Sequence, residues 1–193
     1  MLSLLAAHLR PRYKECSFFA NNKHKGHKFM ELDPSKLSMT VLMTPDQANF
    51  SGNVHGGTIL KYLDQVAYAC ASRYAGSYVV TLSVDQVTFR QPVHVGELVT
   101  FLASVNYTGR TSMEVGIKVI TENIREKSVR HTNSCFFTMV AVDDDGKPVA
   151  VPPLQLRTPD QKRRQRNAEE RRKIRLELAE RYQSIQQKTA QSQ

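Results

Sequence analysis

The sequence predicts an α+β domain in which one long central helix is wrapped by a curved antiparallel sheet, with a polar helix added at the C-terminus. Three observations support this fold class. An amphipathic run over residues 56–74 follows a single strand-like segment, four more strand-like segments then follow in series, and the composition after residue 158 changes to mainly Arg, Glu, Lys, Gln and Leu. Strands that follow one another without intervening helices are typical of antiparallel sheets.

The first strand and the central helix are indicated by two different periodicities. Residues 36–43 alternate between apolar and other side chains, which predicts a strand. A Thr-Pro-Asp-Gln turn at 44–47 then leads into a polar loop. The helix should begin at Gly56 and Gly57 and end near Gly76, because glycine commonly terminates helices in the left-handed conformation.

The remaining strands are bounded by turn signals. Glycine-containing or proline-containing turns are expected at 91–92, 95–96, 108–110 and 143–148. The β-rich segments between them predict strands over 79–90, 98–107, 112–124 and 131–142. Within the third of these segments, one face should consist of Met113, Val115, Ile117 and Val119.

A long polar helix is expected over residues 160–186. Pro159 suits a first helical turn, and Asp160 lies near the positive end of the helix dipole. A helix this polar is marginal by itself, so we expect its thin apolar stripe to pack on the sheet domain or on a neighbouring protomer. The stripe consists of Ile174, Leu178, Tyr182 and Ile185.

Charge divides the chain into three expected parts: a basic, disordered N-terminal extension (1–30), the helix-and-sheet domain (31–156) and a basic C-terminal helix (157–193). The formal net charge of +9 comes from the two ends, whereas the middle part is slightly acidic. This distribution disfavours a nucleic-acid module, because basicity is absent from the core. The first part is expected to be either a disordered leader or the product of an upstream start, with Met30 as the alternative start. An amphipathic targeting presequence is the competing interpretation.

Cysteine usage indicates a reducing compartment. The three cysteines lie far apart and form no CxxC pair, so a disulfide framework or a zinc site is not expected. No apolar run approaches the roughly 20 residues that a membrane helix requires. We therefore expect a cytoplasmic protein without membrane partners.

The residues around the helix start carry the groups that hydrolysis of an acyl group needs. The first amides of a helix have no internal partner and can bind a negative charge, and glycine allows a ligand to approach them closely. Asp64 follows Gly57 by seven residues, about two helical turns, so both fall on roughly one face. Asn49 supplies a nearby amide, although a turn-forming role is the alternative for this residue, and Asn53 suits helix capping.

The chain resembles the hotdog-fold acyl-CoA thioesterases, in the single-hotdog bacterial branch of the acyl-CoA hydrolases. The resemblance covers about residues 36–182, and its five motifs occur in the family's order. They are NFSGNVHGG at 49–57, LDQVA at 63–67, TLSVD at 81–85, YTGRTSME at 107–114 and AEERRK at 168–173.

The resemblance implies roles for specific residues. Asp64 matches the catalytic carboxylate, acting as general base or as nucleophile, and both roles remain open. Asn49 matches the second catalytic residue, and the backbone N–H of Gly57 is expected to bind the thioester oxygen. The coenzyme A contacts implied in this way are Leu82, Ser83 and Val84 for the pantetheine arm, and Arg110, Thr111, Ser112, Met113 and Lys173 for the nucleotide.

The resemblance also implies an assembly. One helix cannot cover both the face and the edges of a curved sheet, so self-association is expected. In the family, two protomers pair their sheets, and dimers commonly assemble into trimers of dimers. We expect Asn49 of one protomer to act with Asp64 of its partner, with acyl-CoA as substrate and no separate cofactor, metal or nucleic acid.

Two alternatives remain. A hotdog hydratase or dehydratase would usually place a histidine beside the helix carboxylate, and His55 and His131 suit a loop and a strand position better. A nucleotide- or RNA-binding module would use the basic tail, but the acidic core disfavours it.

Overall fold

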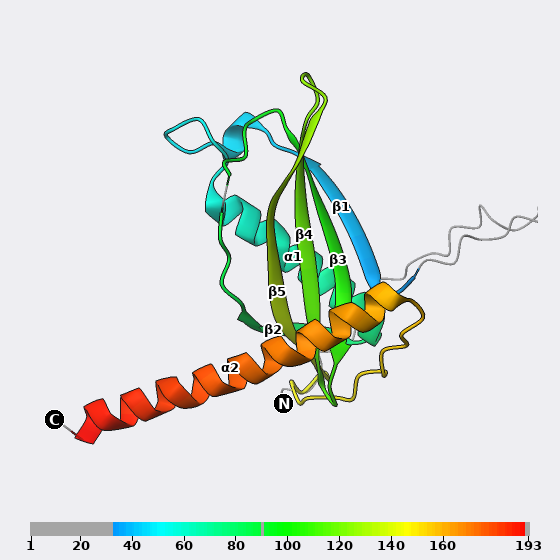
Figure 1. The fold of residues 1–193 in the computed structure, drawn as a ribbon, viewed down its shortest axis with the longest axis vertical. Coiled ribbons are helices and arrows are strands. Elements are labelled where there is room, and N and C mark those ends of the chain that lie inside the picture. The colour runs from blue at the N-terminus through cyan, green and yellow to red at the C-terminus, as the bar shows by residue number, and fades with distance from the viewer. Residues whose placement is uncertain (1–32, 90, 192–193) are drawn as a thin grey trace, which may run out of the picture. The chain divides into compact units, whose positions relative to one another are not determined.

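The computed structural model describes residues 33–89 and 91–191. The expected extension over residues 1–30 lies outside them. The α+β class with a helix wrapped by an antiparallel sheet is confirmed (Figure 1). The elements are β1 (Lys36–Leu42), the short helix η2 (Pro45–Gln47), α1 (Gly56–Ala75), β2 (Tyr78–Val84), β3 (Leu98–Thr108), β4 (Ser112–Asn123), β5 (Ser128–Val142) and α2 (Pro159–Gln191).

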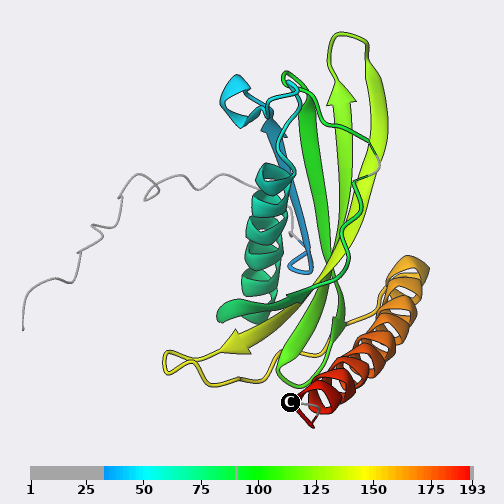
Figure 2. The ribbon, with the colours of Figure 1, turned by 90° about the vertical axis from the view of Figure 1, so that its left-hand side faces the viewer.

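The five strands form one sheet in the order β1-β3-β4-β5-β2, and every neighbouring pair is antiparallel. The two edges are therefore β1 and β2, the strands on either side of α1 in the sequence. Figure 2 shows α1 and α2 on opposite faces of this sheet. The sheet thus has a helix-covered inner face and an outer face that α2 crosses near one end.

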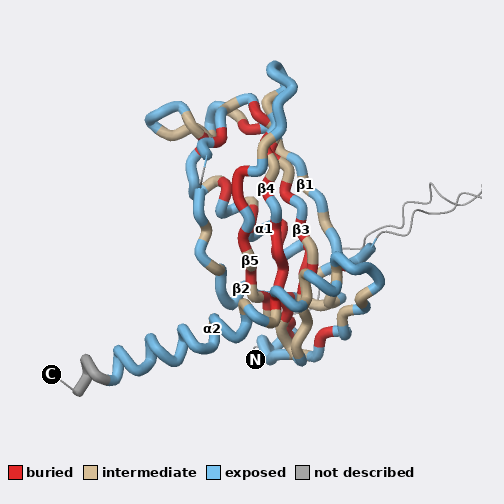
Figure 3. The backbone as a smooth tube through the Cα atoms, in the orientation of Figure 1, coloured by how far each residue is buried: buried red, intermediate tan, exposed pale blue. Residues whose placement is uncertain are grey.

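The core lies between α1 and the inner face (Figure 3). The predicted alternation of β4 is confirmed, because Met113, Val115, Ile117 and Val119 are all buried there. The buried face of α1 consists of Ile59, Leu63, Val66, Ala67, Cys70 and Ala71. Burial raises the pKa of the Cys70 thiol to about 11, which keeps it protonated and unreactive near neutral pH.

The predicted helix end is confirmed and has a local cause. Gly76 follows α1 with φ 69° and ψ 17°, and its N–H donates to the carbonyl of Ser72. This left-handed conformation is easily adopted by glycine and costly for other residues. Because Gly76 ends the helix in this way, β2 begins only two residues later, at Tyr78, and lies next to α1.

Two predicted strand boundaries are wrong. The strand expected over 79–90 ends at Val84, and the N–H of Asp85 makes the last bond to β5, at the carbonyl of Phe136. Residues 85–89 are not paired in a strand, because a β-rich composition favours extended backbone but cannot supply a neighbouring strand. The last strand begins at Ser128 instead of residue 131, because the Asn123 side chain accepts the N–H groups of Arg125 and Glu126 in a short turn, after which Ser128 pairs directly with Asn123.

For α2, the first of the two expected attachments is not observed, and the second, to a neighbouring protomer, stays a prediction. The apolar stripe does not pack on the sheet of its own protomer, since Ile174, Leu178, Tyr182 and Ile185 are between 46% and 61% exposed. The face of α2 that contacts the sheet instead contains Ala168, Arg171 and Arg175. Both arginines bond Glu114, whose side chain points from β4 to the outer face.

Close packing on this outer face depends on Gly116. A Cβ atom at this position would overlap Nδ2 of Asn106 and would lie 3.1 Å from the ring of Phe136. We predict that Gly116→Ala lowers the free energy of unfolding by about 1–3 kcal/mol, the usual cost of overpacking. Denaturant unfolding measures this change.

The matched control is the double variant Gly116→Ala/Asn106→Ala, which removes the overlapping amide. Its loss of stability should be smaller than the sum of the two single losses, because the overlap with the Asn106 amide no longer exists and only the closer approach to Phe136 remains. Additive losses, or a Gly116→Ala protein as stable as the wild type, would contradict this account of the packing.

Candidate active site

The start of α1 presents backbone donors to an open surface. His55 is the N-cap, in place of the expected Asn53, and no side chain caps the helix. The carbonyl of His55 accepts the N–H groups of Thr58 and Ile59, which follow the two glycines. A Cβ atom on Gly57 would meet no heavy atom within 4 Å. The amide of Gly57 is therefore approachable by an oxygen that carries negative charge.

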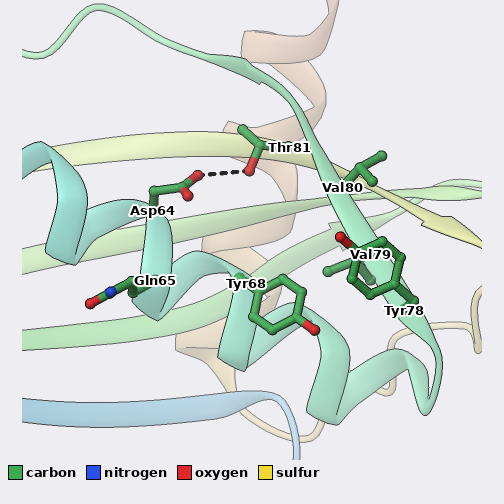
Figure 4. Close-up of a pocket in the computed structure, with 7 residues that line it drawn as sticks. All are labelled: Asp64, Gln65, Tyr68, Tyr78, Val79, Val80 and Thr81. Carbon is green, nitrogen blue, oxygen red and sulfur yellow. Dashed lines mark hydrogen bonds between the residues drawn. The ribbon is translucent and has the colours of Figure 1, made fainter.

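Asp64 lies on the exposed side of α1 and is fixed by the edge strand. Its Oδ1 accepts a hydrogen bond of 2.8 Å from the hydroxyl of Thr81 in β2 (Figure 4). Thr81 also lies 3.6 Å from the sulfur of Met139. Because one carboxylate oxygen is held, the side chain has a defined orientation while remaining accessible to a ligand.

Thr81 is a site residue that sequence analysis did not assign. It belongs to the TLSVD motif, but a threonine in a β-rich segment is ordinary and gave no separate signal. Only the pairing of β2 with β5 places it next to the helix. The contact of a strand hydroxyl with a helix carboxylate depends on tertiary structure and could not be found from spacing.

A pocket of about 320 Å³ lies between α1 and β2, next to Asp64 (Figure 4). Tyr68, one turn beyond Asp64, meets Tyr78 edge-to-face with ring centroids 5.9 Å apart. The lining residues are Asp64, Gln65, Tyr68, Tyr78, Val79, Val80 and Thr81. The pocket thus combines apolar walls with a carboxylate at one end, which suits an apolar group joined to a reactive carbonyl.

Asn49 has the turn-forming role that was the alternative at this position. Its Oδ1 accepts the N–H groups of Ser51 at 2.9 Å and Asn53 at 3.1 Å. Within the described residues, its Nδ2 has no hydrogen-bond partner, so the amide retains free donors. Among the described residues, the side chain of Asn49 bonds its own loop and that of Asp64 bonds Thr81, and no hydrogen bond joins the two within one chain.

The residues expected to bind the pantetheine arm are accessible. Leu82 and Val84 are 68% and 44% exposed, and Ser83 is also exposed, all on the edge strand β2. An edge strand offers unpaired backbone groups along which an extended chain can bind. The position of these residues is compatible with the expectation.

The residues expected to bind the nucleotide differ in how far their side chains are exposed. Arg110 is exposed in the turn between β3 and β4, with Thr111 and Ser112 half-buried beside it. Met113 is only 1% exposed and belongs to the core, so its side chain cannot contact a ligand. Lys173 is exposed on α2, and a hydrogen bond from its ammonium to Glu170, together with that carboxylate's charge, raises its pKa.

No histidine lines the Asp64 pocket, and Nε2 of His131 contacts the carbonyl of Asn133 and the hydroxyl of Ser134. Among residues 33–89 and 91–191, no group of His, Cys, Asp or Glu side chains could hold a metal. The helices described are not apolar enough over a sufficient length to cross a membrane.

Comparison with known proteins places this geometry in a family. Residues 51–128 match the thioesterase superfamily. Protein VdlD of Helicobacter pylori is 51% identical over 143 residues, which are 74% of this chain and 82% of that protein.

Two solved structures also resemble the chain. An apo-hexameric acyl-CoA thioesterase matches with TM-score 0.73 and 38% identity, covering 76% of this chain and 94% of that one. The acyl-CoA hydrolase of Staphylococcus aureus, in complex with butyryl coenzyme A, coenzyme A and coenzyme A disulfide, matches with TM-score 0.71 and 29% identity. That match covers 83% of this chain and 96% of the hydrolase.

The turn-forming role of the Asn49 side chain can be tested by itself. Asn49→Ala removes the acceptor for two loop amides, whereas Asn49→Asp retains it. We predict that Asn49→Ala accelerates hydrogen exchange of the Ser51 and Asn53 amides about 2- to 10-fold, the size expected for one net hydrogen bond. Exchange in Asn49→Asp should match the wild type, and equal acceleration in both variants would contradict the turn-forming role.

Proposed function

The chain belongs to the hotdog-fold acyl-CoA thioesterases, and on that premise we propose that Asp64 is the catalytic carboxylate with which it hydrolyses acyl-CoA to a free carboxylic acid and coenzyme A. The observation that carries the proposal is the Asp64–Thr81 hydrogen bond of 2.8 Å. It orients a solvent-accessible carboxylate at the end of an apolar pocket. The open amide of Gly57 lies two turns earlier on the same helix.

The Staphylococcus aureus hydrolase provides independent support. Its solved variants replace one asparagine, one aspartate or one threonine by alanine. The aspartate lies 15 residues after the asparagine, and the threonine lies 17 residues after the aspartate. Asn49, Asp64 and Thr81 have the same two spacings, which favours the same three positions in this chain.

The proposed chemistry assigns one task to each group. The N–H of Gly57 binds the thioester oxygen, which becomes negative when the carbonyl carbon is attacked. If Asp64 removes a proton from the attacking water, the resulting hydroxide adds to the carbon and the carbon–sulfur bond breaks to give the acid directly. If Asp64 attacks the carbon itself, that bond breaks to leave a mixed anhydride, which a water molecule then hydrolyses to the acid and the free Asp64 carboxylate. In either route coenzyme A leaves as a thiolate and takes up a proton. The free Nδ2 donors of Asn49 hold the water or polarise the carbonyl, while Thr81 keeps the carboxylate in place.

Coenzyme A is proposed to bind as part of the substrate, without a separate cofactor. Its pantetheine arm would follow Leu82, Ser83 and Val84 along the exposed edge of β2. Its nucleotide would lie near Arg110 and the exposed ammonium of Lys173, both of which can neutralise phosphate. Met113 would contribute only backbone groups.

We also propose a homodimer as the minimal active unit, assembled further into a trimer of dimers. The edge strand carries the exposed apolar side chains Tyr78, Val80, Leu82 and Val84, and an uncovered apolar edge favours pairing with another copy. Two similar proteins are hexamers, namely the apo-hexameric acyl-CoA thioesterase described above and a thioesterase of Yersinia pestis, and this supports the larger assembly. In the dimer, Asn49 of one protomer would act beside Asp64 of its partner.

Substitution of the carboxylate tests the proposed function. We predict that Asp64→Ala and Asp64→Asn lower kcat by about 10²–10⁴-fold, as expected for loss of a general base. Thr81→Val should cause a smaller loss, because the carboxylate remains but loses its orienting hydrogen bond. Release of free thiol from acyl-CoA substrates of increasing chain length measures these rates.

Asp46→Asn is the matched control, since this exposed acid of η2 lies outside the pocket. It should retain wild-type kcat. An Asp64→Asn enzyme within a few-fold of the wild type would eliminate Asp64 as the catalytic carboxylate.

A further inference from the structure

Four charged side chains meet on the outer face of the sheet, away from the Asp64 pocket. Glu114 comes from β4, Asp85 directly follows β2, and Arg171 and Arg175 come from one face of α2. Their formal charges cancel. Asp85, Glu114 and Arg171 lie in three of the five sequence motifs, and Arg175 lies just after the last one. None of these four residues has a role in the proposed mechanism.

Glu114 is the buried centre of this cluster. Its side chain is 1% exposed, and Arg171 bonds both its oxygens, with Nη2 2.7 Å from Oε1 and Nε 3.2 Å from Oε2. Arg175 adds a third contact, 2.9 Å from Nη2 to Oε2. A buried carboxylate requires such partners, because desolvation otherwise disfavours its charge. The guanidinium of Arg171 also lies 3.6 Å from the ring centroid of Phe136.

Arg175 connects this buried pair to a different part of the protein. Its Nη1 lies 2.9 Å and 3.2 Å from the two carboxylate oxygens of Asp85. Asp85 is the residue after Val84, where β2 ends and the chain leaves β5. One guanidinium therefore joins α2 both to the centre of the sheet and to the end of its edge strand.

The second connection is not needed to neutralise the buried charge. Asp85 is 21% exposed in its side chain, so water can solvate it without Arg175. Glu114 would keep both arginines if Asp85 lost its carboxylate. The attachment of α2 and the connection to β2 are thus separable by mutation.

We propose that Asp85 and Arg175 are positioning residues for acyl-CoA binding. By fixing the end of β2 to α2, they hold the segment Leu82–Val84 in the position in which it receives the pantetheine arm, which both an acyl-CoA and an acyl-pantetheine contain. Lys173 itself is exposed and bonds Glu170 instead of the cluster. This inference rests on the proposed function, because it assumes that Leu82–Val84 and Lys173 bind coenzyme A.

The test compares acyl-CoA with an acyl-pantetheine that lacks the nucleotide. Asp85→Ala should raise KM for both substrates about tenfold, the size of one lost charge-assisted hydrogen bond, with kcat changed less than about twofold. Arg175→Lys should have the same pattern, because an ammonium cannot bond both carboxylates as the planar guanidinium does. Lys173→Ala should raise KM for acyl-CoA only.

The control Arg172→Ala, at an exposed neighbouring position on α2, should leave both KM values unchanged. An Asp85→Ala enzyme with wild-type KM for both substrates overturns the proposal. A lower melting temperature together with kcat and kcat/KM lowered by the same factor also overturns the proposal. That pattern would mean that the pair stabilises the fold and has no separate effect on substrate binding.

Calorimetric titration with coenzyme A separates this proposal from the assignment of Asp64. In an Asp64→Asn background, adding Asp85→Ala should weaken coenzyme A binding by the same factor of about ten. This binding result does not depend on turnover. If the Asp64→Asn enzyme is active, Asp64 is not the catalytic carboxylate, but the comparison of coenzyme A binding is still valid. If adding Asp85→Ala leaves coenzyme A binding unchanged, only the positioning role of Asp85 and Arg175 is overturned.

Discussion

A single curved sheet can cover only one side of the helix that it wraps, and the remaining features of this protein follow from that constraint. The covered side of α1 holds the core, whereas the uncovered side carries Asp64 and Tyr68 beside the edge strand. The fold therefore exposes its candidate catalytic carboxylate in the same place where it exposes apolar surface. In the proposed dimer, a second copy that covers the apolar edge of β2 would also cover the pocket beside Asp64. The active site would then be complete only in the assembled protein.

The two faces of the sheet are built by different interactions. The inner face contacts α1 through apolar side chains that alternate along the strands. The outer face holds α2 through Glu114 and two arginines, which define a specific position for the helix. The buried carboxylate of Glu114 requires the two partly exposed guanidinium groups as partners. The side chains of Ile174, Leu178 and Tyr182 on α2 are exposed in the protomer.

The sequence contained enough information for the fold because its signals were local. The glycine pair and Gly76 mark both ends of α1, and alternation identifies the inner face of β4. Features that depend on contacts between distant segments were not accessible in this way. The end of β2 depends on where β5 stops pairing, and the orientation of α2 depends on Arg171 and Arg175 meeting a glutamate in β4, more than fifty residues earlier. The contact of Thr81 with Asp64 is hidden from the sequence for the same reason, and the burial of the Met113 side chain leaves only its backbone for the ligand contact expected there.

The central claim is that each site is completed between protomers, by Asn49 of one chain and Asp64 of the other. Co-refolding Asn49→Ala and Asp64→Ala proteins tests it most directly, with mixed dimers confirmed by native mass spectrometry. Each mixed dimer would contain one doubly defective site and one intact site. At random mixing the shared-site arrangement therefore predicts recovery of about a quarter of wild-type hydrolysis from two nearly inactive parents. If both residues acted within one chain, every site would carry one defect, and the absence of recovered activity in confirmed mixed dimers would contradict the account.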